Sequence, residues 1–141
     1  MVIAVDFDGT IVQHQYPKIG PEIPFATETL RMLINDGHQL ILWSVREGHL
    51  LKEAVDWCRE RGVEFYAVNK DFYEEDESKN KVFSRKLKAD LFIDDRNIGG
   101  LPDWGTIYRM ITEKKTLEEL LLEELGQEHP LQSKRKWWQV F

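Results

Sequence analysis

The sequence predicts an α/β protein, a Rossmann-like three-layer sandwich with a central parallel sheet. Short apolar runs rich in Val, Ile and Leu alternate along the chain with segments whose apolar residues recur at helical spacing. This alternation is typical of parallel strands joined by right-handed helical crossovers. In addition, the clearest apolar runs end in acidic or hydroxyl side chains, which is where open α/β sheets bind their ligands.

The first half of the chain is expected to contain two strand–helix units and a third strand. The opening run is rich in β-branched residues, which favour strands. Pro24 and Gly37 enclose a segment with one apolar face, and these residue types are typical of helix boundaries. The expected elements are a strand at 2–5, a flap at 11–24, a helix between 24 and 37, a strand at 39–43, a helix at 49–61 and a strand at 63–68.

The second half is less regular. An acidic and polar run at 73–78 favours a solvated loop. Thr116 and Glu119 match a capping box, which marks the start of a helix. The expected elements are a loop at 69–85 that leads into a short helix, a strand at 91–93, a short fifth strand at 106–110 and a helix from 116 to near 126.

These elements predict one domain at 1–126, followed by a basic and aromatic tail at 127–141. One domain fits a length of 141 residues. The tail combines cations and aromatic side chains, a composition that suits a stacked nucleic-acid base or a partner groove. Packing of the aromatic side chains back on the domain is the preferred interpretation.

Composition predicts a cytoplasmic protein. No apolar run approaches the roughly 20 residues that span a bilayer, and no secretory leader is visible. Cys58 can form no internal disulfide, as expected in a reducing compartment, and is interpreted as a buried structural thiol. The net charge of −6 argues against non-specific nucleic-acid binding, and no membrane partner is expected.

Two acidic pairs follow two of the predicted strands. Asp6 and Asp8 follow the opening strand two residues apart, so they can point to the same side. Asp94 and Asp95 directly follow the strand at 91–93. Four acids at one sheet edge repel one another, and a divalent cation relieves this repulsion most directly. The sequence therefore predicts a Mg²⁺ site, since this cation prefers oxygen ligands.

The order of the motifs resembles that of the haloacid dehalogenase superfamily of phosphotransferases. The chain runs from Asp-x-Asp-Gly-Thr at 6–10 to Ser44 at a strand end, then to a lysine, and last to the Asp-Asp pair at 94–95. The four motifs together are far more specific than any of them alone. A phospho-accepting receiver domain uses similar groups, but it opens with the adjacent acidic pair, which here comes last.

The resemblance implies a covalent mechanism. Asp6 corresponds to the nucleophile, which attacks phosphorus and becomes an aspartyl-phosphate. Asp8 corresponds to the general acid/base, which protonates the leaving alkoxide and later deprotonates water, and its backbone carbonyl is expected to face the metal. An acid at position 8 favours phosphomonoester hydrolysis or phosphomutase chemistry over dehalogenation, because a leaving halide needs no proton.

Further residues are assigned to the substrate by the same resemblance. Ser44 is expected to donate a hydrogen bond to a phosphoryl oxygen. Thr10 is expected to stabilise the geometry of the opening loop and to contact the substrate. Arg46 is interpreted either as a substrate contact or as a surface residue at a helix start. A lysine is expected to offset the negative charge of nucleophile and phosphate. Lys86 is the first choice, because similar sequences carry Lys four residues before the leading acid of the acidic strand, and Lys88 is the competitor.

The predicted metal residues are Asp6, Asp8, Asp94 and Asp95. Asp95 is preferred to Asp94 as a direct ligand, because it matches the acid of the family's commoner Gly-Asp form. That form has a further acid a few residues on, whereas this chain has Asn97 there. The number of ligands is therefore left open.

The gaps between motifs leave no room for a cap domain. The gap at 11–24 has only the size of a flap, and the gap at 45–85 is filled by a helix, a strand and a loop. The predicted protein is a capless Mg²⁺-dependent phosphomonoester hydrolase that acts on a phosphorylated substrate of open class. The alternative is a non-catalytic phospho-ligand or protein interaction module that keeps the fold. The oligomeric state is left open.

Overall fold

Four parallel strands in the order β3-β2-β1-β4 form the sheet of the described residues, which are 1–69 and 87–126 of this computed structural model. Their bounds are β1 Val2–Val5, β2 Gln39–Leu42, β3 Ala67–Val68 and β4 Leu91–Ile93. The α/β Rossmann-like class with a parallel sheet is thereby confirmed. The predicted strand at 63–68 is shorter than expected, because the Val63 N–H still bonds to Cys58 O at the end of the preceding helix.

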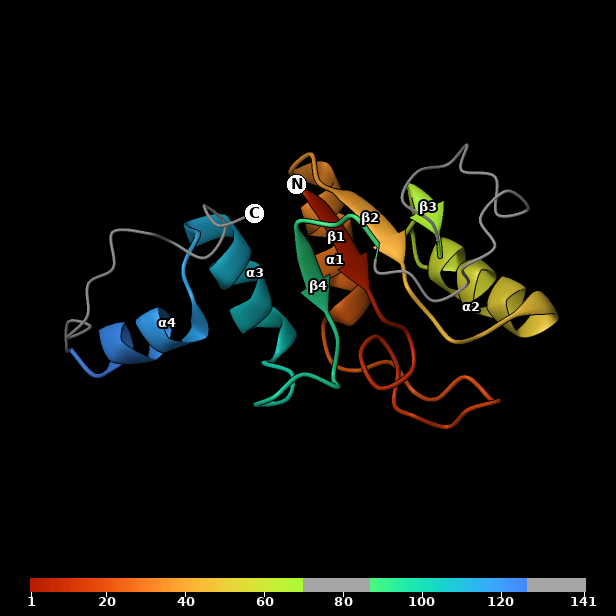
Figure 1. The fold of residues 1–141 in the computed structure, drawn as a ribbon, viewed down its shortest axis with the longest axis horizontal. Coiled ribbons are helices and arrows are strands. Elements are labelled where there is room, and N and C mark those ends of the chain that lie inside the picture. The colour runs from red at the N-terminus through yellow and green to blue at the C-terminus, as the bar shows by residue number, and fades with distance from the viewer. Residues whose placement is uncertain (70–86, 127–141) are drawn as a thin grey trace. The chain divides into compact units, whose positions relative to one another are not determined.

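Two helices connect β1, β2 and β3. They are α1 Ala26–Asn35 and α2 Gly48–Glu60, and α1 lies across one face of the sheet (Figure 1). The two helices are linked by Nη1 of Arg31, in the middle of α1, which donates at 2.6 Å to Arg61 O at the C-terminal end of α2. Successive right-handed crossovers in one direction place both helices on the same face.

A row of apolar residues runs across the sheet in register. Phe92, Ala4, Ile41 and Ala67 stand side by side on neighbouring strands. Ala4, Ile41 and Ala67 belong to one buried cluster together with Leu87. The alternate β1 residues, on the other face, are also buried. A parallel sheet apolar on both faces matches the near-continuous hydrophobic runs of the sequence.

The segment between β1 and α1 is a short flap and contains no cap domain. Its base is a pair of antiparallel segments, in which the Gln13 N–H bonds to Pro21 O at 2.8 Å and the Ile23 N–H bonds to Ile11 O at 2.9 Å. Residues 13–18 at the tip are exposed. In the second gap, 45–85, residues 45–69 contain α2 and β3 as expected, and residues 70–85 lie outside the described residues.

The structure divides into two compact units, Met1–Leu101 and Pro102–Phe141. In the second unit, α3 spans Trp104–Glu113 and α4 spans Leu117–Glu124. The predicted strand at 106–110 is therefore wrong. Asp103 caps a helix there by accepting from the Thr106 N–H at 3.0 Å.

The α3 segment was open to misassignment because its β-branched residues favour a strand locally. Its buried residues instead follow helical spacing, at Trp104, Ile107 and Ile111. The capping box predicted for the next helix is confirmed. Thr116 accepts from the Glu119 N–H, and the Glu119 carboxylate accepts from the Thr116 N–H, both at 3.1 Å.

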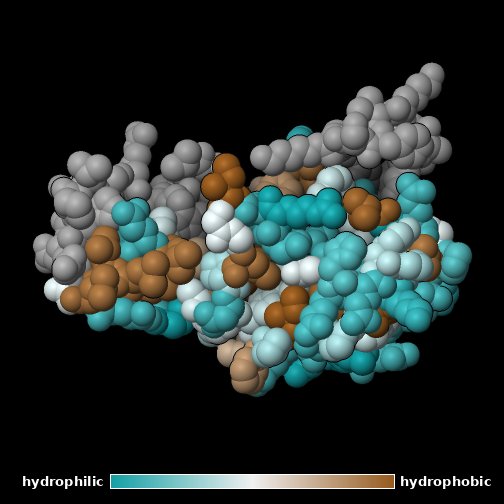
Figure 2. All heavy atoms as spheres, turned by 90° about the horizontal axis from the view of Figure 1, so that it is seen from below, coloured by the Kyte–Doolittle hydropathy of each residue, from teal (hydrophilic) through white to brown (hydrophobic). Residues whose placement is uncertain are grey.

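Apolar side chains gather on α4, in the brown area at the left of Figure 2. Leu121 and Leu125 are 50% and 71% exposed. Within 1–69 and 87–126, no helix has the length and apolar character needed to cross a membrane. Cys58 is buried, and burial raises the pKa of its thiol to about 12, so it is a structural residue as predicted.

Candidate metal centre

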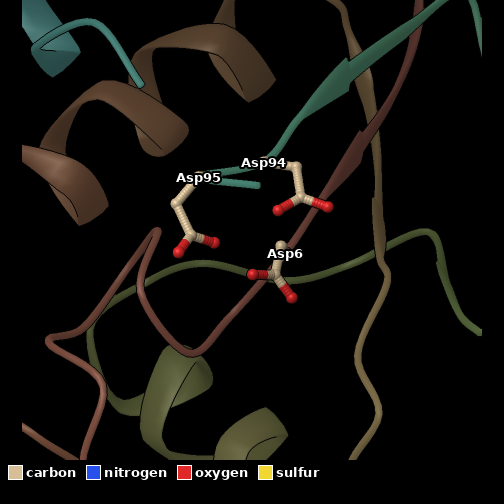
Figure 3. A group of neighbouring side chains, drawn as sticks. All are labelled: Asp6, Asp94 and Asp95. Atoms are coloured by element: carbon tan, nitrogen blue, oxygen red, sulfur yellow. The ribbon is translucent and has the colours of Figure 1, made fainter. Parts of the chain in front are cut away.

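Three carboxylates converge at the carboxyl ends of the two strands β1 and β4. Asp6 follows β1, and Asp94 and Asp95 follow β4. One carboxylate oxygen of each lies within 4.8 Å of the others, and the three side chains point toward a common space (Figure 3). The Asp6 N–H also bonds to Ile93 O at 3.0 Å, which extends the pairing of the two strands up to the site.

The position of this cluster follows from the strand order. The chain moves from β1 outward through β2 and β3, and then returns to place β4 on the other side of β1. The junction of β1 and β4 is thus the point where the winding reverses. Open α/β sheets bind ligands at this point, outside the carboxyl ends of the strands.

Thr10 links the two halves of the cluster. Its buried hydroxyl lies 3.3 Å from Oδ2 of Asp6 and 3.2 Å from Oδ1 of Asp95, and its oxygen accepts from the Asp95 N–H at 3.1 Å. The turn after β1 makes this possible, because Phe7 O accepts from the N–H groups of Thr10 and Ile11. Thr10 therefore orients carboxylates in the structure.

Gly9 allows the two acidic turns to come into contact. Its φ is +87°, and a Cβ at this position would lie 2.4 Å from Oδ2 of Asp95. Any larger residue would carry backbone strain and would also displace the carboxylate. The glycine of the opening motif thus serves the geometry of the acid cluster.

The cluster is electrostatically strained without a cation. The pKa of Asp6 is raised to about 7, first by burial and then by the negative charge of Asp94 and a hydrogen bond with Asp95. A carboxyl group with this pKa is half protonated near neutrality. The three oxygen donors fit a hard divalent cation such as Mg²⁺, which completes its coordination with water and phosphate.

Asp94 and Asn97 also shape the turn after β4. Oδ1 of Asp94 accepts from the Arg96 N–H at 3.0 Å. Nδ2 of Asn97 donates to Asp94 O at 2.8 Å. Asn97, which stands where a further acid was a possible ligand, therefore closes the turn that presents Asp94 and Asp95.

Asp8 does not join the cluster and is paired with Arg46 instead. The guanidinium meets the carboxylate in a bidentate pair, with Nε to Oδ2 at 2.7 Å and Nη2 to Oδ1 at 2.8 Å. The carboxylate of Asp8 thus lies outside the group formed by Asp6, Asp94 and Asp95, and the expected part of its backbone carbonyl in metal binding stays a prediction. The hydrogen bond with Asp8 raises the pKa of Arg46.

Arg46 is completely buried and uses every N–H of its guanidinium. Besides the bonds to Asp8, Nη2 donates to Lys18 O at 3.0 Å. Nη1 donates to Pro17 O at 3.2 Å and to Leu50 O at 3.5 Å. The structure thus places it neither on the surface nor in position to donate to a substrate.

Ser44 lies two residues beyond β2, at the same edge of the sheet. Its oxygen accepts from the Arg46 N–H at 3.1 Å, and its own N–H donates to Oδ1 of Asn69 at 2.8 Å. Ser44 thus connects the segment between β2 and α2 to the residue that follows β3. Asn69 was missed in the sequence, although it follows β3 as the acids follow β1 and β4.

The lysine assignment is only partly described. Lys86 lies outside the described residues. Lys88 precedes β4 and lies near Asp90, whose Oδ2 accepts from the Val2 N–H at 2.8 Å at the amino end of β1. Lys88 thus lies at the edge of the sheet opposite the acid cluster.

No protein-family model and no curated protein matches the chain. A solved structure of a conserved protein coded by a locus from Bacteroides thetaiotaomicron is 68% identical in sequence, with a TM-score of 0.78. The match covers 85% of this chain and 96% of that chain. The chain therefore belongs to the same protein family as this conserved protein of Bacteroides thetaiotaomicron.

Proposed function

We propose that the protein is a Mg²⁺-dependent phosphomonoester hydrolase of the haloacid dehalogenase type. The observation that carries the proposal is the convergence of Asp6, Asp94 and Asp95 at the winding-reversal point of the sheet. A bound Mg²⁺ would supply charge neutralisation for the carboxylates and the phosphoryl oxygens. The motif order of the sequence supports the same assignment.

Asp6 is the proposed nucleophile. Its carboxylate oxygen attacks phosphorus, the bond to the alcohol oxygen breaks, and an aspartyl-phosphate forms. Water then attacks phosphorus, releases phosphate and restores the carboxylate. Thr10 contributes by holding Asp6 and Asp95 in a fixed relation during both displacements.

Ser44 and Asp8 have supporting roles in the proposal. The Ser44 hydroxyl donates to a phosphoryl oxygen from the neighbouring strand end. Asp8 protonates the leaving alkoxide and deprotonates the water. Each carboxylate oxygen of Asp8 accepts one N–H of Arg46, which leaves its second lone pair for the proton that Asp8 transfers. The proposal also includes a cytoplasmic location, in keeping with the single Cys58.

The test is hydrolysis of an aryl phosphate with Mg²⁺ and again with excess chelator. Turnover is expected only with Mg²⁺, and Asp6→Asn should abolish it. Asp56→Asn is the matched control, because this carboxylate pairs with Lys52 on the exposed side of α2. Equal rates with metal and chelator, or an active Asp6→Asn variant, would contradict the proposal. A wild type inactive on every phosphomonoester tried would favour the interaction module.

A further inference from the structure

Arg46 is the junction of three segments that are far apart in the sequence. Its guanidinium bonds to the carboxylate that follows β1, to two carbonyls of the flap tip and to a carbonyl in the first turn of α2. Its Cζ lies 5.2 Å from the ring centroid of Phe7 and 5.3 Å from that of Tyr16. Two aromatic rings thus lie close to the guanidinium, one from the turn after β1 and one from the flap.

We propose that Arg46 is a positioning residue that couples the flap tip to Asp8, so that the flap sets the orientation of this carboxylate. The catalytic part of this inference rests on the proposed function. Within 1–69 and 87–126, the hydrogen bonds from another segment to the tip carbonyls at 17 and 18 come from Arg46. The base of the flap is held separately by its own antiparallel pairing.

The coupling follows from the burial of the charge. A buried guanidinium is stable only while its partners stay in place, and removing one partner leaves an uncompensated charge. If Asp8 moves away from Arg46, the N–H groups that it leaves must therefore find acceptors among the flap carbonyls. Conversely, if the flap contacts are lost, Arg46 is held mainly by its two bonds to Asp8, and both side chains can shift together.

The geometry also explains why the residue is arginine. Lysine would present three donors from one nitrogen and could not form the planar bidentate pair while reaching three carbonyls. Its ammonium would also stack less well between the rings of Phe7 and Tyr16. Arg46 thus acts through its shape as well as its charge.

The first test measures hydrogen exchange of the flap amides, which needs no enzymatic activity. Asp8→Asn should speed exchange of the Lys18 N–H, which bonds to Gln15 O within the tip, by about tenfold or more, because a charge-assisted anchor is lost. Tyr16→Ala, a change at a residue 46% exposed, should have the same direction of effect. Tyr66→Ala is the matched control, because Tyr66 is 38% exposed and does not make the contact with Arg46 that Tyr16 makes.

The second test is kinetic and uses Tyr16→Ala, which does not alter the acid cluster. We expect kcat on an alkyl phosphate to fall about tenfold, as for partial loss of a positioned acid/base, with less effect on an aryl phosphate and on KM. The stabilisation by Mg²⁺ should equal that of the wild type, because Arg46 contacts none of the three cluster carboxylates. A purely structural role predicts equal losses on both substrates.

The outcomes separate the two proposals. Flap exchange unchanged in Asp8→Asn and Tyr16→Ala, or a Tyr16→Ala variant that matches Tyr66→Ala in exchange and kinetics, would overturn the coupling. A wild type without phosphatase activity would refute the proposed function, while faster flap exchange in the variants would still support the coupling of the flap to Asp8.

Discussion

Gly9 and Asp95 are in such close contact that a methyl group on the glycine would lie 2.4 Å from the carboxylate oxygen. These residues belong to turns that follow different strands, and the contact fixes the distance between them. The space that the missing side chain leaves is filled by Asp95 itself. Substitution at Gly9 therefore tests whether the acid cluster depends on this fit.

Gly9→Ala should destabilise the protein and also weaken metal binding. The left-handed conformation at φ +87° costs alanine about 1–2 kcal/mol, and the clash with Asp95 adds to this loss. The measurements are urea unfolding and the thermal shift on addition of Mg²⁺. Gly37→Ala is the control, because Gly37 has φ +93° with no heavy atom near its Cβ position. If both variants kept the same Mg²⁺ shift, the fit between the turns would be irrelevant to the site.

Thr10→Val should reduce Mg²⁺ affinity while keeping the fold. Valine fills the same volume but removes the hydroxyl that bridges Asp6 and Asp95. Groups that orient metal ligands typically account for about 10–100-fold in affinity. Calorimetric titration with Mg²⁺ measures the change. Thr10→Ser retains the hydroxyl and should recover most of the affinity, and failure to do so would mean that the methyl group matters instead.

The pH dependence of stability should carry the signature of Asp6. In the metal-free folded protein its pKa is about 7, against an ordinary value of 3.8. Between these values the folded state binds more protons than the unfolded state, so stability falls as pH rises and levels off above the folded pKa. Urea unfolding in chelator at about pH 5 and about pH 8 measures this slope.

Two comparisons isolate the contribution of Asp6. Asp6→Asn should flatten the slope, since no titrating group remains at that position. Mg²⁺ binds the ionised carboxylate, so its stabilising effect should grow as pH rises through about 7. A slope identical in wild type and Asp6→Asn would assign the pH dependence to other groups.

The two candidate lysines should differ sharply in activity. Lys86→Ala should lower turnover by roughly 10²-fold or more, as expected when a positioned charge near phosphate is lost. Lys88→Ala should have little effect, because Lys88 lies three residues before β4 at the edge of the sheet opposite the acids, whereas Lys86 has the spacing from Asp90 that similar sequences show. Steady-state kinetics on one substrate compare the two, and the reverse ranking would transfer the role to Lys88.

The sequence predicted the parts of the fold that depend on local patterns. The capping box at Thr116 involves residues three apart, so its geometry follows from the sequence alone. The convergence of Asp6 with Asp95 was predictable because parallel strands end at one edge. The α3 segment was mispredicted, since the Asp103 cap and the helical spacing of its apolar residues outweighed β-branched side chains.

The pairing of Asp8 with Arg46 was not predictable from local pattern. The two residues are 38 positions apart, and their contact depends on how the flap folds back over the turn. An arginine near a helix start is usually a surface residue, and only the contacts of Arg46 with Asp8 and the flap show that it is buried. Asn69 was accessible in principle, because the rule that assigned a role to polar residues after β1, β2 and β4 also applies after β3.

The strand order has a consequence for the synthesis of the protein. Among the strands that the structure describes, β4 is made last, and the turn after it supplies two of the three carboxylates beside β1. A nascent chain that has not yet reached Asp94 and Asp95 exposes Asp6 without these partners and lacks two of the three carboxylates of the proposed cation site. Asp6 therefore meets Asp94 and Asp95 only after β4 has left the ribosome and paired with β1. Binding of a cation at the proposed site would then indicate that β4 has joined the sheet.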